Sequence, residues 1–236
     1  MTDVSSFPIT AGALTAGDIR HLVGKDDPVI IEVGANCGQT TVELLRAMPG
    51  ATIFAFEPEP RAIAKFRKAI ANPKVHLYEC AIGAVDGTTS FYQSSGAEHL
   101  LEYREGWDQS GSIRRPNSHL KVWPWVKFEQ KITVPIMTLD NWGKQHQITK
   151  ADFIWADVQG AEGDLVEGAT QFLKSSRYFY TEYSNDEWYE GQITLADLLK
   201  KLPDFELVRR YAMDALFKNM RIAPKTSRTF YPTIRV

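Results

Sequence analysis

Val29-Ile30-Ile31-Glu32-Val33-Gly34-Ala35-Asn36-Cys37-Gly38 is the stretch of sequence that decides the fold. Mostly β-branched apolar residues lead into a glycine-bearing turn, and residues 39–46 follow with the apolar spacing of a helix. The stretch therefore predicts a strand, a tight loop and a helix. Glycines let backbone N–H groups approach a ligand, and the start of a helix offers unpaired donors and a partial positive charge. We expect a nucleotide-like cofactor at Gly34 to Gly38.

The alternation of strand and helix continues on both sides of this stretch. A short helix is predicted over 15–23, and strands over 52–56 and 75–79 enclose a helix over 62–70. Such alternation predicts right-handed βαβ units and a parallel sheet, here in one α/β domain over residues 1–236. Further strands are predicted at 152–156 and 178–181, helices at 139–146, 161–173 and 194–202, and a closing β-hairpin at 205–211 and 215–218.

The periodicity is lost between two shorter predicted strands, at 88–93 and 132–136. The 94–131 segment has no clear period, and a long aperiodic segment inside a domain is typical of a functional loop. Its tryptophans and polar groups suit sugars or other polar ligands, so we predict a substrate-side insertion. The alternative is an ordered surface insertion with its own aromatic cluster. As candidates for binding an acceptor, the sequence offers Ser112, Arg114, Trp123 and, after the strand at 178–181, Tyr183.

Composition and charge exclude several classes of protein. With 44% hydrophobic residues the chain is able to bury a core, and Lys+Arg 27 against Asp+Glu 29 gives no reason to expect nucleic acid as a partner. Two cysteines are too few for a disulfide framework and fit a reduced, cytoplasmic setting. The sequence lacks an apolar run long enough for stable membrane insertion. It does not indicate an oligomeric state.

The glycine spacing helps to choose between cofactors. Dinucleotide-binding loops favour Gly-x-Gly-x-x-Gly because the pyrophosphate lies close to backbone at the second glycine. Here that position is Asn36, whose side chain would obstruct a pyrophosphate. A smaller carboxylate with a neighbouring ammonium, as in S-adenosylmethionine, suits the loop Gly34-Ala35-Asn36-Cys37-Gly38 better. Glu32 on the preceding strand is a candidate for the positive end of such a ligand.

The ends of the next two strands supply further candidate cofactor contacts. Glu57 follows the second strand, 23 positions after Gly34, where doubly wound folds place an acid on the ribose hydroxyls. Its alternative role is to cap the helix after Pro58. Cys80 and Ala81 follow the third strand and are expected on the adenine side, although a plain buried turn is the alternative there.

Five motifs follow one another along the chain: Glu32-Val-Gly-Ala-Asn-x-Gly38, Phe56-Glu57-Pro58, Ala81-Ile82-Gly83 with Asp86-Gly87, Thr138-Leu139-Asp140, and Asp157-Val-Gln-Gly-Ala-Glu162 with Gly168-Ala169. In this order they resemble the FkbM family of S-adenosylmethionine-dependent methyltransferases. The resemblance implies a class I methyltransferase fold, a Rossmann-like, doubly wound seven-stranded sheet whose last strand is antiparallel. It also implies methyl transfer to oxygen, often to a sugar hydroxyl of a glycolipid, polysaccharide or natural product. This sequence departs from the family's Asp-Val-Glu-Gly-x-Glu at Gln159.

The transfer itself requires alignment of acceptor, methyl and sulfur, and removal of a proton from the hydroxyl. Asp157, after the fourth core strand, is predicted either to hold the methionine ammonium or to act as the base; helix capping is its alternative role. His119 and His99 are alternative bases because imidazole titrates near neutral pH. Glu182, after the fifth core strand, is predicted to act in catalysis at the same crevice or to bind acceptor or a divalent metal, which we leave unassigned.

Two other classes of protein are compatible with part of this pattern. A nicotinamide-dependent oxidoreductase lacks its glycine spacing here and would reveal itself by binding NAD. A non-catalytic binding protein that kept the methyltransferase fold would bind S-adenosylmethionine or nothing, without methyl transfer to any acceptor. The substitution at Gln159 is the feature that hints at such a loss of activity.

Overall fold

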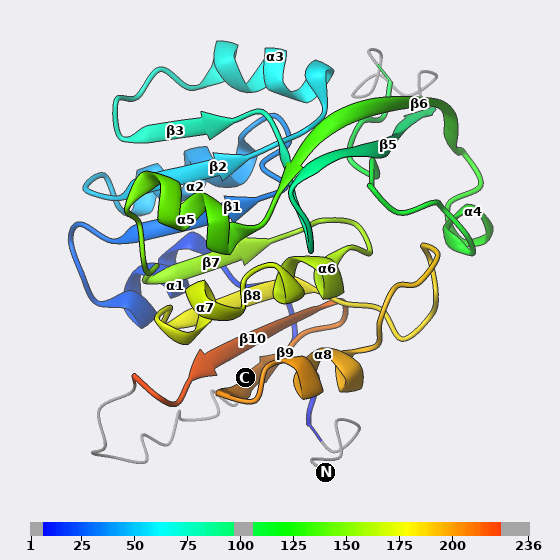
Figure 1. Cartoon of the computed structure of the whole chain (residues 1–236). Helices are drawn as coiled ribbons and strands as arrows, with labels where there is room; N and C mark the ends of the chain where they lie inside the picture. Colours follow the sequence, from blue (N-terminus) through cyan, green and yellow to red (C-terminus); the bar gives the residue numbers. More distant parts are fainter. Residues whose placement is uncertain (1–6, 97–105, 223–236) are drawn as a thin grey trace.

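A seven-stranded sheet forms the centre of the molecule (Figure 1). The computed structural model describes residues 7–96 and 106–222. The strand order is β3-β2-β1-β7-β8-β10-β9, with parallel neighbours except at β10, which is antiparallel to β8 and β9. This confirms the predicted sheet and its closing hairpin. The strands are β1 (Val29–Val33), β2 (Thr52–Phe56), β3 (Val75–Tyr78), β7 (Phe153–Ala156), β8 (Tyr178–Glu182), β9 (Phe205–Arg210) and β10 (Asp214–Asn219).

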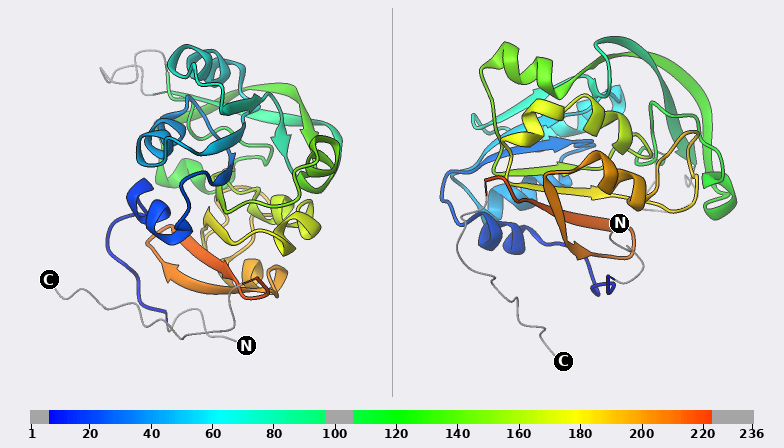
Figure 2. Two further views of the ribbon diagram at one scale, coloured as in Figure 1. Left: turned by 90° about the vertical axis from the view of Figure 1, so that its left-hand side faces the viewer. Right: turned by 60° about the horizontal axis from the view of Figure 1, so that its bottom comes forward.

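Helices cover both faces of this sheet, as the first view of Figure 2 shows. Successive strand residues point to opposite faces, so Ile30 and Ile53 pack towards α1 and α2, whereas Ile31 and Phe54 pack towards α5–α8. Burying one such side chain contributes about 1.5–3 kcal/mol. The larger helices are α1 (Ala16–Val23), α2 (Gln39–Ala47), α3 (Pro60–Ala69), α5 (Leu139–His146) and α8 (Leu195–Lys201).

The helix predicted at 161–173 is instead two short helices, α6 (Glu162–Glu167) and α7 (Thr170–Lys174). Gly168 ends α6, and a Cβ atom there would lie 1.9 Å from the carbonyl oxygen of Gly83. The Gly168 carbonyl accepts a hydrogen bond from the Asp140 N–H at 3.0 Å. The interruption thus follows from close contacts with distant segments, which apolar periodicity does not report.

A second, three-stranded sheet rises from the edge of the domain (Figure 1). Its strand order is β4-β6-β5, with β4 (Ala81–Ile82), β5 (Gly87–Gly96) and β6 (Val126–Met137). The predicted boundaries of the 94–131 segment are therefore wrong at both ends, since β5 and β6 continue into it. A short helix, α4 (His119–Val122), lies within the remainder. Among the described residues, no helix is long and apolar enough to cross a membrane.

The order of the strands creates a switch point between β1 and β7. The chain runs outward from β1 through β2 to β3 and later returns to place β7 on the other side of β1. The connections after β1 and β7 therefore lead towards opposite edges of the sheet. Folds of this kind bind ligands beyond the carboxyl ends of the two strands at the switch point. Gly34 follows β1 and Asp157 follows β7, and the Asp157 N–H donates to the Val33 carbonyl at 2.9 Å.

Candidate functional site

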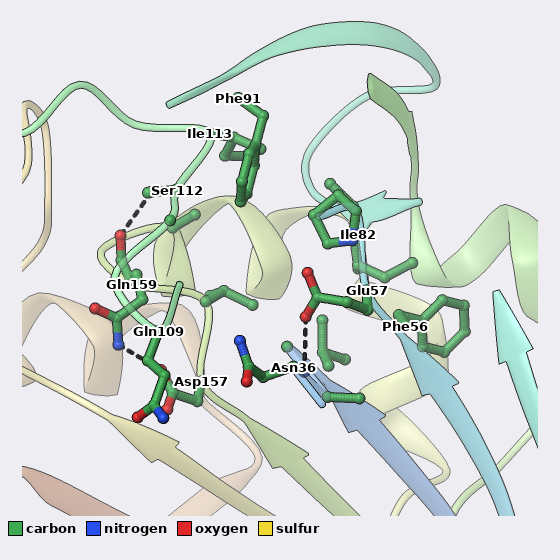
Figure 3. A pocket seen from close by; sticks show the side chains of 18 of the residues that line it. Asn36, Phe56, Glu57, Ile82, Phe91, Gln109, Ser112, Ile113, Asp157 and Gln159 are labelled. Atoms are coloured by element: carbon green, nitrogen blue, oxygen red, sulfur yellow. Dashed lines mark hydrogen bonds between the residues drawn. The ribbon is translucent and has the colours of Figure 1, made fainter. Parts of the chain in front are cut away.

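A cavity of about 300 Å³ opens at this switch point (Figure 3). Its floor is the loop after β1, its sides are the ends of β2, β4 and β7, and residues 108–113 cross over it. Predicted cofactor residues that line it are Gly34, Ala35, Asn36, Glu57, Pro58, Cys80, Ala81 and Asp157.

The loop after β1 has a backbone that few sequences adopt. Gly34, Asn36 and Gly38 have φ of 82°, 44° and 88°, in the region that favours glycine and tolerates asparagine. A Cβ atom on Gly34 would lie 1.8 Å from the Asp157 carbonyl oxygen. The backbone of β1 can therefore approach that of β7 only with glycine here. The Asn36 side chain points into the cavity (Figure 3).

Glu57 is 5% exposed and is held by backbone at both carboxylate oxygens. Oε2 accepts from the Asn36 N–H at 2.7 Å, and Oε1 accepts from the Glu59 N–H at 2.8 Å. Each carboxylate oxygen has a further lone pair available for a ligand. Burial raises the pKa of Glu57 to about 7, although the two backbone hydrogen bonds oppose the shift.

One wall of the cavity is apolar. Ile82, Phe91 and Ile113 line it; in Figure 3 the Phe91 and Ile113 side chains lie beside each other and Ile82 lies near Glu57. Burial raises the pKa of the nearby Cys80 thiol to about 11, so this group is a neutral thiol at physiological pH. This wall suits a flat, weakly polar group such as a purine base.

The segment over the cavity, residues 108–113, is fixed on both sides. On one side the Asp108 carbonyl accepts from Asn36 Nδ2 at 3.1 Å, and its carboxylate pairs with Lys65 Nζ at 2.7 Å. On the other, Ser112 Oγ donates to the Gln159 carbonyl at 2.7 Å. The predicted substrate-side insertion thus contributes part of the cavity wall.

The side-chain amide of Gln159 lies between the carboxylates of Asp157, which follows β7, and Glu182, at the end of β8. Gln159 Nε2 donates to Asp157 Oδ1 at 2.7 Å and to Glu182 Oε2 at 2.9 Å. Solvent in the cavity reaches Asp157, but protein surrounds it elsewhere, and this loss of hydration raises its pKa. Burial, and then the charge of Asp157, raise the pKa of Glu182 well above its usual value. Glu182 itself lies behind Gln159 and does not line the cavity.

Glu32 and Gly38 do not line the cavity. Glu32 is 1% exposed beneath α2, where Oε2 accepts from Thr41 Oγ1 at 2.5 Å. Burial raises its pKa to about 8. Gly38 is the N-cap residue that precedes α2, and a Cβ atom there would lie 2.5 Å from Ile70 Cδ1. Both residues support the loop from the protein interior. The direct contact with a ligand that was expected of Glu32 has no support in this geometry.

Of the four predicted acceptor contacts, Ser112 alone lines the cavity. The Arg114 guanidinium is held by both carboxylate oxygens of Asp164, at 2.7 and 2.6 Å. The Trp123 ring packs edge-on against Trp188. The Tyr183 hydroxyl donates to the Tyr211 carbonyl and accepts from Arg210 Nε. The other three side chains are therefore engaged elsewhere in the fold.

His119 is 2% exposed among aromatic rings, away from the cavity. It contacts Trp123, Phe128 and Tyr189, and burial lowers its pKa to about 4. The predicted role as base fails for a geometric reason, because the ring does not reach the cavity. His99, the other alternative, lies outside the described residues.

No three His, Cys, Asp or Glu side chains among residues 7–96 and 106–222 are arranged to hold a metal ion. Several other residues that line the cavity are not predicted from the sequence. Gln109 belongs to the aperiodic segment, and the alternation of β5 and β6 does not indicate that Phe91 faces a ligand. The missed lining residues are Val33, Gln39, Thr40, Phe56, Ile82, Phe91, Asp108, Gln109, Gly111, Ile113, Trp155, Val158, Gln159 and Ala161.

The buried carboxyl groups predict an unusual dependence of stability on pH. The pKa values of Glu32, Glu57 and Glu162 are raised from 4.5 to about 8, 7 and 7, chiefly by burial. The folded chain then holds protons that the unfolded chain releases, so the free energy of unfolding should increase as the pH falls from about 8.5 to about 6. The slope is about 1.4 kcal/mol per pH unit for each such proton, measurable by urea unfolding.

Glu32→Gln is the matched control for this prediction. It mimics the protonated acid and retains an acceptor for Thr41 Oγ1. It should flatten the pH dependence and stabilise the protein at the alkaline end. Stability that increases with pH over this interval would contradict the assigned pKa directions.

A family model and several known proteins are similar to this chain. A family model described as "Methyltransferase FkbM domain" matches residues 32–218. The chain is 40% identical to 2-O-methyltransferase NoeI of Sinorhizobium fredii over 86% of this chain and 84% of that protein. It is 25% identical to Methyltransferase 1 of Beauveria bassiana over 61% and 59%. A solved putative rRNA-methylase from Clostridium thermocellum, 8% identical, matches 89% of this chain and 98% of its own with a TM-score of 0.48.

Proposed function

Because the chain belongs to the FkbM methyltransferase family, we propose that it transfers the methyl group of S-adenosylmethionine to a hydroxyl oxygen of a carbohydrate. The observation that carries this proposal is the cavity at the switch point, with Glu57 and Asp157 on opposite sides of it. One carboxylate suits the ribose hydroxyls of a nucleoside. The other would remove the proton of the acceptor hydroxyl.

The residues present fit this cofactor. Asn36 Oδ1 is buried and has no hydrogen-bond partner within the described residues, so it is available to the methionine ammonium. Glu57 is held by backbone in position to accept from two ribose hydroxyls. The Cys80-Ala81 turn, with Phe91 and Ile113, would enclose the adenine.

Bound in this cavity, S-adenosylmethionine supplies an electrophilic methyl group on a positively charged sulfur. Asp157 would orient the acceptor hydroxyl and take its proton as the oxygen becomes methylated. A base need only be within hydrogen-bond reach of that proton and ionised. With Asn36 available to the ammonium, we assign Asp157 the role of base. No metal ion is part of this assignment.

The acceptor oxygen is inferred from the relative, and the carbohydrate that carries it from the cavity wall near Asp157. The relative that is 40% identical is named a 2-O-methyltransferase. Gln109 and Ser112 line the cavity on the same side as Asp157 (Figure 3), and amide and hydroxyl groups of this kind can exchange hydrogen bonds with sugar hydroxyl groups. We therefore propose a glycoside or polysaccharide as the acceptor.

Two measurements test the proposed function. Calorimetry with S-adenosylhomocysteine should show binding, whereas NAD should not bind. Mass spectrometry of a panel of glycosides and nucleotide sugars incubated with S-adenosylmethionine should show the addition of one CH₂ unit to one class of acceptor. Cofactor binding without transfer to any acceptor would favour the non-catalytic alternative, and binding of NAD would favour an oxidoreductase.

The pKa of Glu57 predicts how cofactor binding depends on pH. The ionised group accepts from both ribose hydroxyls, whereas the acid form has one oxygen occupied by its own proton. Affinity for S-adenosylhomocysteine should therefore fall as the pH decreases through about 7, the folded-state pKa. Glu57→Gln should bind about 10-fold or more weakly and lose this pH dependence. An unchanged affinity would exclude Glu57 as the ribose ligand. Glu43→Gln, an exposed position on α2, is the control.

A further inference from the structure

The side-chain amide of Gln159, in the turn after β7, has three hydrogen-bond partners. Its Nε2 donates to Asp157 and to Glu182, and its Oε1 lies 3.0 Å from the Tyr189 hydroxyl. Its main-chain carbonyl accepts from Ser112 Oγ. The residue has φ of 51°, a conformation that a non-glycine side chain seldom adopts. Together these contacts fix the orientation of the Gln159 amide.

We propose that Gln159 is a positioning residue for methyl transfer: its amide orients the Asp157 carboxylate and supplies the hydrogen bond that stabilises its ionised form beside Glu182. The proposal rests on Asp157 acting as the base. It assigns a definite role to the position at which this chain departs from its family's glutamate.

The surrounding charges explain what a neutral donor contributes at this position of the chain. Within residues 7–96 and 106–222, the titratable groups that interact electrostatically with Asp157 are acids: Glu182 from β8, Asp214 from β10, Glu162 from α6, and the Tyr189 hydroxyl. Neighbouring carboxylates disfavour each other's ionised form. A primary amide has two N–H donors, one for each acid, and adds no charge.

The proton distribution follows from the same contacts. Burial, and then the charges of Asp157 and Glu162, raise the pKa of Glu182 well above its usual value, whereas the pKa of Asp157 is raised by burial but lowered by hydrogen bonding to its carboxylate. Glu182 is therefore the member of the pair that holds the proton, and Asp157 is the member that can accept one. The Gln159 hydrogen bond also lowers the pKa of Asp157. Removing it should make the base titrate at a higher pH.

The test compares Gln159→Leu and Gln159→Glu with the unmodified protein. Leucine removes both donors, and glutamate replaces them with a further acid. In both variants kcat should fall about 10-fold or more, and the acidic limb of the pH profile of kcat should move up by about one pH unit. KM and the affinity for S-adenosylhomocysteine should change less than about threefold, since Gln159 acts through Asp157.

Gln192→Leu is the matched control. Gln192 Oε1 accepts from the N–H groups of Trp188 and Tyr189, so it holds the same loop through backbone. This variant should leave the acidic limb where it is. If it shifts the limb as Gln159→Leu does, or if Gln159→Leu changes KM alone, the effect belongs to the loop and the proposal is overturned.

Infrared titration of the cofactor-free protein gives a readout independent of turnover. Subtracting the spectrum of the matching Asp157→Asn protein isolates the protonated carboxyl band of Asp157, which should persist to higher pH in Gln159→Leu than in the unmodified protein. An Asp157 band that titrates identically in both refutes the role of Gln159 even where methyl transfer occurs. Absence of methyl transfer would refute the proposed function and leave the infrared result interpretable.

Discussion

Replacing Asp157 by asparagine is expected to lower kcat by about 100-fold to 10,000-fold, the range over which a positioned general base contributes. Asparagine has nearly the same shape and retains an oxygen that accepts from Gln159 Nε2, so the turn after β7 should fold as before. It cannot take up the acceptor proton at working pH. The loss should therefore appear in kcat, measured by steady-state kinetics at saturating acceptor and cofactor.

Binding separates the two roles considered for Asp157. If it is the base, the affinity of Asp157→Asn for S-adenosylhomocysteine should remain within about threefold of the unmodified protein. If it holds the methionine ammonium, affinity should fall with turnover. Asp27→Asn, an exposed aspartate before β1, should alter neither quantity. Full activity of Asp157→Asn would remove this residue from the mechanism.

Replacing Gly34 by alanine should abolish cofactor binding and destabilise the fold by about 2–5 kcal/mol, from backbone strain and overpacking together. The added Cβ atom would lie 1.8 Å from the Asp157 carbonyl oxygen, a contact that backbone cannot relieve without separating β1 from β7. Separation of these strands opens the floor of the cavity and displaces Asp157. Urea unfolding and calorimetry with S-adenosylhomocysteine measure the two effects.

The chain contains a matched control for the contribution of backbone conformation alone. Gly12 has φ of 80°, close to the 82° of Gly34, but no atom lies within 4 Å of its added Cβ. Gly12→Ala should therefore cost about 1–2 kcal/mol, the intrinsic penalty of this conformation, and leave cofactor affinity unchanged. Equal losses in the two variants would show that the contact with Asp157 does not matter.

The chemistry of the site was only partly predictable. Glu57 and Asp157 follow buried strands, and strand ends in a parallel sheet meet at one edge, so the sequence placed both beside a cofactor loop. The sequence alone could not show that His119 is enclosed by aromatic rings, that Arg114 is engaged by Asp164, or that Glu182 lies behind Gln159. These outcomes depend on which side chains meet across long sequence separations.

The sequence by itself determined the alternation of strands and helices, the glycine loop after β1 and the antiparallel last strand, because apolar periodicity and turn residues act over a few neighbouring positions. The tertiary structure alone decided that β5 and β6 form a second sheet, that Gly168 interrupts a helix, and that residues 108–113 cross the cavity. It also decided that Gln159 lies between two acids. Hydrogen bonds and close contacts between distant segments set these features, and no local pattern encodes them.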